Sequence, residues 1–195
     1  KRTVGFAVKR SMPTLSKVTL KDWFGKRPTT NNPKPIVKGK VYLFCDEFTN
    51  YNDAHIGITA VQLLEKLGYE VMIPQHEESG RTWLSKGLVR KAKLIANKNI
   101  ELLKDLITEE TPLIGIEPSA ILTFRDEYPD LATDENLAAA KSLAKNALFI
   151  DEFLVKEIEK GMISKELFTK ESKLIQLHGH CQQKAVGSLA GSVKL

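Results

Sequence analysis

Side chains that could bind a metal or perform acid–base chemistry are concentrated in four short stretches of the sequence. Residues 45–47, 76–80, 117–119 and 178–181 each follow a short apolar run. Together they supply Asp, Glu, His, Cys and Ser, a set that suits a metal site as well as general acid–base catalysis. Polar loops of this kind occur at the edge of any α/β sheet, so the residue types alone leave the chemistry open.

The elements that must position these residues begin with a strand, a helix and a second strand. The apolar run 40–44 ends at acidic residues, as a buried strand does where it enters a polar loop. From Ala54 apolar residues recur at helical spacing until Gly68, and a second apolar run covers 69–73. This order predicts a βαβ unit, whose loops open at the carboxyl edge of a parallel sheet.

The rest of the chain continues the same alternation. We expect an α/β fold, a Rossmann-like parallel sheet flanked by helices, in which three or four loops meet at the carboxyl edge. The further elements expected from the pattern are a helix over 81–106, a third strand over 112–117, a helix from Pro118, a helix capped by 133–135, a helix capped by Asp151 and closed by Gly161, a fourth strand over 173–178, and a helix over 182–189.

Composition narrows the class of protein. The chain has 195 residues, of which 42% are hydrophobic, enough for one good core. Its apolar runs are far shorter than a membrane helix needs, and the N-terminus lacks the apolar core of a signal peptide. Two cysteines make neither a disulfide framework nor a four-thiolate site. We therefore expect a cytoplasmic protein without a transmembrane segment.

Charge is uneven along the chain. Residues 1–38 hold ten Lys or Arg and one Asp, together with four prolines, whereas the remainder has more acidic than basic residues. This stretch predicts an extended basic arm or linker. Docking of the arm on nucleic acid or a partner is an alternative, but its apolar residues are scattered, so no nucleic acid is expected.

Phosphate-binding loops of the two common types are absent, because the sequence contains neither G-x-G-x-x-G nor G-x-x-x-x-G-K-[ST]. The nearest candidate is the 78–87 loop, with Gly80, Arg81 and Lys86 at the expected start of a helix. An anion- or nucleotide-binding module that uses this loop is the alternative function.

Three motifs resemble a known family. They are SGRTWLSKG at 79–87, GIEPSA at 115–120 followed by RDEYP at 125–129, and HGHCQQK at 178–184. These resemble the cysteine-rich (CCG-type) domain of FAD-linked oxidases, of glycolate oxidase iron–sulfur subunits and of the heterodisulfide reductase B subunit. Residues 10–13 and 20–24 look like the connector that precedes this domain in long, fused FAD-linked oxidases.

The resemblance implies ligand positions for an iron–sulfur cluster, and most of them lack cysteine. In the family each repeat has one cysteine, then Cys-Cys-Gly, then Cys-x-x-Cys. On this chain these positions fall at Asp46, Glu78, Ser79, Glu117 and Ala120. Clusters need soft sulfur ligands, so we expect a degenerate motif without a metal or cofactor in this segment.

The resemblance also implies a parent protein that is longer than this sequence, which begins at Lys1 rather than Met. Residues 1–38 would be the arm, 39–170 the degenerate domain, and 171–195 the start of a second repeat with Cys181 as a cluster ligand in the parent. FAD and iron–sulfur clusters would lie in the flavin domain, the ferredoxin-like domain and the rest of the second repeat. The parent would oxidise a 2-hydroxy acid such as lactate or glycolate, in the cytoplasm or peripheral to the membrane. This segment would be inactive alone, with no catalytic residue.

Overall fold

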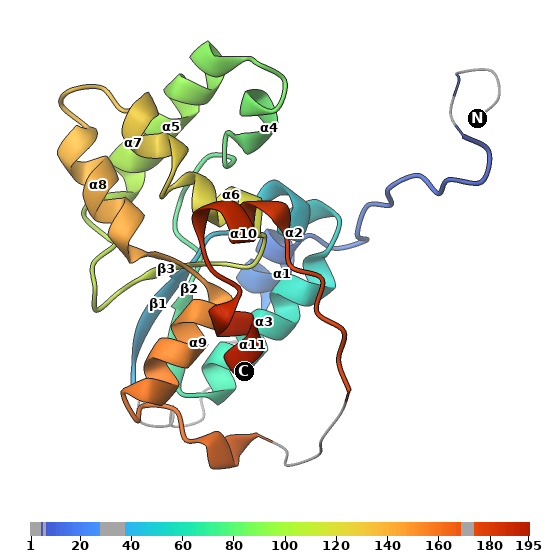
Figure 1. Cartoon of the computed structure of the whole chain (residues 1–195), viewed down its shortest axis with the longest axis vertical. Coiled ribbons are helices and arrows are strands. Elements are labelled where there is room, and N and C mark those ends of the chain that lie inside the picture. The colour runs from blue at the N-terminus through green and yellow to red at the C-terminus, as the bar shows by residue number, and fades with distance from the viewer. Residues whose placement is uncertain (1–4, 6, 28–37, 169–173) are drawn as a thin grey trace.

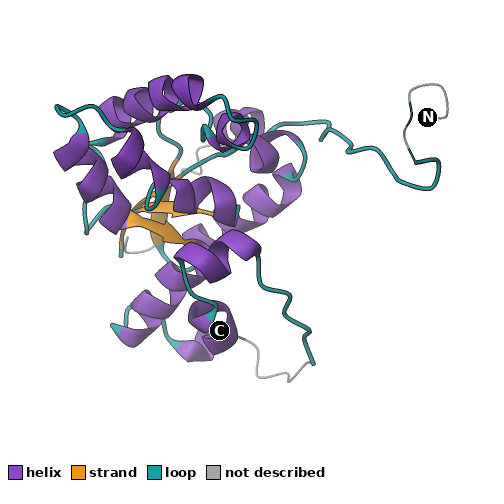
Figure 2. Ribbon diagram, turned by 45° about the horizontal axis from the view of Figure 1, so that its top comes forward, coloured by secondary structure: helices purple, strands orange, loops and turns teal. Residues whose placement is uncertain are grey.

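The computed structural model describes residues 5, 7–27, 38–168 and 174–195. In this part of the chain a parallel four-stranded sheet lies between helices (Figures 1 and 2). The predicted α/β fold is therefore confirmed. The strands follow the spatial order β2-β1-β3-β4, with β1 at Gly39–Leu43, β2 at Tyr69–Met72, β3 at Leu113–Gly115 and β4 at Ala147–Phe149.

The βαβ unit forms as its periodicity predicts. Strand β1 pairs in parallel with β2, with Val41 opposite Val71, and helix α3 (Ala54–Lys66) connects them. Gly68 has a φ of +99°, a left-handed conformation that lets the chain leave α3 and enter β2 directly.

Each face of the sheet has its own core, because side chains alternate along a strand. Val41 and Leu43 of β1 pack with α1, α3 and α9 on one face, and Tyr42 and Phe44 pack with α5, α6, α7 and α8 on the other. The helices are α1 (Leu20–Lys26), α2 (Glu47–Tyr51), α4 (Arg81–Leu84), α5 (Val89–Leu103), α6 (Pro118–Thr123), α7 (Glu127–Leu131), α8 (Leu137–Asn146), α9 (Ile150–Glu159), α10 (Cys181–Val186) and α11 (Ala190–Lys194), and a 3-10 turn covers Lys165–Leu167.

The expected single helix over 81–106 is wrong, since two helices occupy this stretch. α4 ends at Leu84 and α5 starts at Val89, with Gly87 at a φ of +72° between them. A residue in the left-handed region ends an α-helix, so the apolar periodicity continues across a turn.

The expected fourth strand over 173–178 is also wrong for the residues that the structure describes. Residues 174–180 form a loop, with Leu174 99% and Ile175 80% exposed, and the fourth strand is instead β4. An apolar run without a neighbouring strand has no hydrogen-bonding partner for its backbone. Lys173 lies outside the described residues.

Two predicted helix caps are wrong. Asp151 is the second residue of α9, and the cap comes from Glu152, whose carboxylate accepts the N–H of Phe149 at 3.0 Å. α8 starts at Leu137, because residues 134–136 form a turn in which the N–H of Asn136 donates to the carbonyl of Thr133. The helix predicted to open at Pro118 is confirmed as α6.

Part of the predicted arm is a packed helix rather than an extended linker. Leu20 of α1 is fully buried, and a Cβ at Gly57 of α3 would lie 2.4 Å from its Cδ2. The described residues before α1 run away from the body of the molecule (Figure 1), and residues 28–37 lie outside the described part. No helix among the described residues is long and apolar enough to cross a membrane.

Candidate functional site

Asp46, at the end of β1, caps helix α2. Its carboxylate accepts hydrogen bonds from the N–H groups of Phe48 at 2.9 Å and Thr49 at 2.8 Å, and from the Thr49 hydroxyl at 2.5 Å. The side chain is 1% exposed, and burial raises its pKa to about 6, against the lowering effect of the Thr49 hydrogen bonds. The nearby carboxylates of Glu117 and Glu47 also raise this pKa.

Glu47 joins the loop after β1 to the loop after β2. It accepts hydrogen bonds from the Ser79 hydroxyl at 2.7 Å and from the Ser79 N–H at 3.1 Å. The Ser79 hydroxyl oxygen in turn accepts from the N–H of Arg81 at 3.1 Å. Ser79 is fully buried, so its hydroxyl is used inside the protein.

The loop after β2 is also held from beneath by two buried side chains. Asn99 of α5 accepts from the N–H of Glu77 at 2.8 Å and donates to the carbonyl of Glu78 at 2.9 Å. It also donates to the Tyr128 hydroxyl at 2.8 Å, and Tyr128 donates to the carbonyl of Ser79 at 3.0 Å. The hydrogen-bonding groups of Asn99 are thus all used to fix the backbone of residues 77–79.

His76 and Cys45 form a buried pair at the same edge. His76 Nδ1 donates to the carbonyl of Glu77 at 2.6 Å, and Nε2 accepts from the N–H of Cys45 at 3.3 Å. Burial lowers the pKa of His76 to about 4 and raises the pKa of Cys45 to about 12. The Cys45 thiol, 3.5 Å from Asn50 Oδ1, is therefore protonated at neutral pH, and His76 is uncharged.

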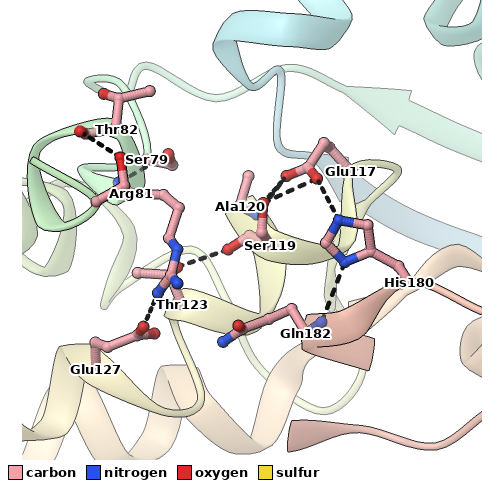
Figure 3. A network of polar contacts seen from close by, with 11 residues as sticks. Ser79, Arg81, Thr82, Glu117, Ser119, Ala120, Thr123, Glu127, His180 and Gln182 are labelled. Carbon is pink, nitrogen blue, oxygen red and sulfur yellow. Dashed lines mark hydrogen bonds and ion pairs between the residues drawn. The ribbon is translucent and has the colours of Figure 1, made fainter. Parts of the chain in front are cut away.

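Glu117, at the end of β3, caps helix α6 (Figure 3). Its carboxylate accepts from the N–H of Ala120 at 2.6 Å and from the Ser119 hydroxyl at 2.7 and 2.9 Å. His180 Nε2 lies 3.9 Å from Glu117 Oε1, and His180 Nδ1 accepts from the N–H of Gln182 at 3.2 Å. The start of α10 thereby joins the other three loops.

The remaining residues of the 78–87 loop are engaged with neighbours. Glu78 accepts from Trp83 Nε1 at 2.5 Å. Gly80 has a φ of +78° and precedes α4, and the Arg81 guanidinium forms an ion pair with Glu127 (Figure 3).

Lys86 and Cys181 are exposed to solvent. Lys86 lies in the turn between α4 and α5, and Cys181 is the first residue of α10. Among the described residues, no group of three or more His, Cys, Asp or Glu side chains has an arrangement that could hold a metal ion.

The structure therefore brings Asp46, Ser79 and Glu117 to loops of one sheet edge, where each is hydrogen bonded. Sequence analysis missed the side chains that bind these loops to one another. Tyr128 lies inside the RDEYP motif and could have been found there, and Glu47 is adjacent to Asp46. His76 was placed in the correct loop, but nothing in the sequence pairs Asn99 with residues 77–79.

Comparison with known proteins finds similar segments in oxidoreductases. The chain is 25% identical over 180 residues to D-2-hydroxyglutarate dehydrogenase of Pantoea ananatis, which covers 88% of this chain and 17% of that protein. It is 24% identical over 155 residues to one of the subunits of anaerobic glycerol-3-phosphate dehydrogenase of Escherichia coli, covering 78% and 37%. It is 30% identical over 145 residues to lactate utilization protein A of Bacillus subtilis, covering 73% and 57%. The chain thus spans less than two thirds of the length of each of these relatives. No protein-family model and no solved structure matches.

Proposed function

We propose that this chain is an electron-transfer or scaffold domain of a longer FAD-linked oxidoreductase that oxidises a 2-hydroxy acid. The observation that carries the proposal is the similarity to D-2-hydroxyglutarate dehydrogenase, which extends over 88% of this chain but only 17% of that protein. One domain of a larger dehydrogenase accounts for both values. Similarity to lactate utilization protein A supports the same substrate class.

The domain itself would carry no iron–sulfur cluster. The residues at the ligand positions support this, because Asp46 and Glu117 offer hard oxygen atoms that already accept hydrogen bonds from α2 and α6. Ala120 has no donor atom in its side chain. The thiol of Cys45 is buried and holds its proton. This donor set does not fit a cluster.

The hydrogen bonds at this edge would serve a structural role instead. Glu47 and Ser79 join the first two loops, and His180 lies against Glu117 at the third. A sheet edge closed in this way forms a rigid support for neighbouring domains. FAD and the clusters would be bound by the flavin domain, the ferredoxin-like domain and the rest of a second repeat, in which the exposed Cys181 would be a ligand.

The test is a comparison of the complete polypeptide with this chain alone. The complete polypeptide should show flavin absorption and should reduce an artificial electron acceptor with at least one of 2-hydroxyglutarate, lactate and glycolate, and this chain alone should do neither. A complete polypeptide without flavin, or without activity on any 2-hydroxy acid, would contradict the proposal.

The anion-binding alternative has less support. Arg81 is paired with Glu127, the Ser79 hydroxyl is buried, and α4 has four residues. Lys86 would then be the main cationic contact in the loop.

A further inference from the structure

The turn between α4 and α5 and the outer face of α5 form a basic surface with exposed aliphatic side chains. We call it the α5 surface, and it lies at one end of the molecule, at the top of Figure 1. Its members are Lys86, Leu88, Val89, Arg90, Lys93, Leu94 and Lys98.

Positive charge on the α5 surface is not balanced locally. The sequence has no Asp or Glu between Ser79 and Ile100. Lys86, Arg90, Lys93 and Lys98 form no ion pair with the residues that the structure describes. Lys91, also on this helix, lies 3.3 Å from the centre of the Trp83 ring and helps to fix α4 against α5.

Aliphatic side chains lie among these cations. Leu94 is 73% exposed, Leu88 49% and Val89 50%. Arg90, Leu94 and Lys98 are spaced by four residues and so form one stripe along the helix. The opposite face of α5 is buried in the core through Ala92, Ala96, Asn99, Ile100 and Leu103.

We propose that the α5 surface docks on an anionic lipid membrane, with the cations on the lipid phosphates and Leu94, Leu88 and Val89 inserted among the headgroups. Amphipathic surface helices bind bilayers through this combination of charge and apolar side chains. The proposal goes beyond the function proposed above and does not depend on it.

Charge and shape favour a bilayer over a protein partner. A stable protein interface buries about 800 Å² on each side and needs a complementary shape. The outer face of one helix is convex, and a single leucine in the middle of a stripe gives a protein little to enclose. A bilayer adapts to a convex surface, and each cation near anionic headgroups strengthens binding by roughly fivefold.

Co-sedimentation of the whole chain with vesicles tests the proposal. The wild type should bind vesicles of equal parts phosphatidylglycerol and phosphatidylcholine, bind pure phosphatidylcholine far less, and dissociate at high ionic strength. Reversal of two charges, Lys93→Glu with Lys98→Glu, should weaken binding by at least about 25-fold. Leu94→Gln should weaken it by roughly fivefold without changing the charge.

The matched control reverses two exposed lysines on another helix, Lys141→Glu with Lys145→Glu on α8. It should change binding much less than the α5 double variant. Circular dichroism melting should show that all variants remain folded, since every altered side chain is exposed. The proposal is overturned if the wild type does not bind anionic vesicles, if the control weakens binding equally, or if Leu94→Gln binds like the wild type.

Discussion

The carboxylate of Glu47 accepts two hydrogen bonds from Ser79, one from its hydroxyl at 2.7 Å and one from its N–H at 3.1 Å. Glu47 follows β1 and Ser79 lies in the loop after β2, so this contact joins two loops that are 32 residues apart in sequence. Ser79 also falls at a position where the resembled family has a cysteine. The serine is therefore part of the support of this edge.

Replacement of Ser79 by alanine should destabilise the fold by about 1–2 kcal/mol. The substitution leaves Glu47 without its hydroxyl donor and the N–H of Arg81 without its acceptor. Urea unfolding measures the change. The control is Ser85→Ala, whose exposed hydroxyl donates to the carbonyl of Thr82, and it should change stability by less than about 0.5 kcal/mol. Equal effects of the two substitutions would contradict a supporting role for Ser79.

Asp46 should make stability fall as pH rises. Its pKa in the folded protein is about 6, above the ordinary value of 3.8, so the folded state binds the proton more tightly than the unfolded chain. The contribution is present in full below about pH 4 and is lost as pH rises through about 6, a change of at most roughly 3 kcal/mol.

Asp46→Asn should remove this part of the pH dependence, because the amide keeps an acceptor oxygen for α2 and cannot ionise. Urea unfolding of both proteins between about pH 4 and about pH 7 gives the comparison. The matched substitution at the exposed Asp53 should leave the wild-type profile unchanged. An Asp46→Asn profile parallel to that of the wild type would show that Asp46 titrates normally.

The sequence predicted the parts of the fold that depend on local periodicity. The βαβ unit and the helix from Pro118 formed because apolar spacing, Gly68 and Pro118 all act within a few residues. The strand over 173–178 failed for the opposite reason. An apolar run becomes a strand only beside a partner, and the sequence cannot show that Leu174 and Ile175 have none.

The candidate site divides in the same way. The sequence indicated which loops meet at the carboxyl edge, since parallel strands fix that edge. It could not show that Asn99 and Tyr128 bind the backbone of residues 77–79, because those contacts join α5 and α7 to a distant loop. The role of Leu20 in the core was hidden by the charges around it.

Leu20→Ala should destabilise the fold by about 2–5 kcal/mol, since the side chain is fully buried against α3. Thermal unfolding of the whole chain measures the loss. Leu15→Ala is the control within the same basic segment, because Leu15 is 76% exposed and should have little effect. A Leu20→Ala variant as stable as the wild type would show that residues 20–26 do not pack on the domain.

The two thiols should differ strongly in reactivity. Cys181 is exposed, whereas Cys45 is buried and its pKa is raised to about 12. A disulfide reagent should therefore modify one thiol per folded chain, and Cys181→Ser should remove that reaction. The second thiol should react only after denaturation. Rapid modification of both thiols in the folded protein would contradict the buried position of Cys45.

The most direct test of the central claim, a sheet edge that has replaced cluster ligands by hydrogen bonds, is the iron and acid-labile sulfide content of the chain after anaerobic reconstitution. The account predicts a colourless, folded protein with iron and sulfide far below one equivalent, and with the same content in a Cys45→Ser, Cys181→Ser double variant. Stoichiometric iron and sulfide with visible absorption, lost in that variant, would show that the two thiols still build a cluster and would contradict the account.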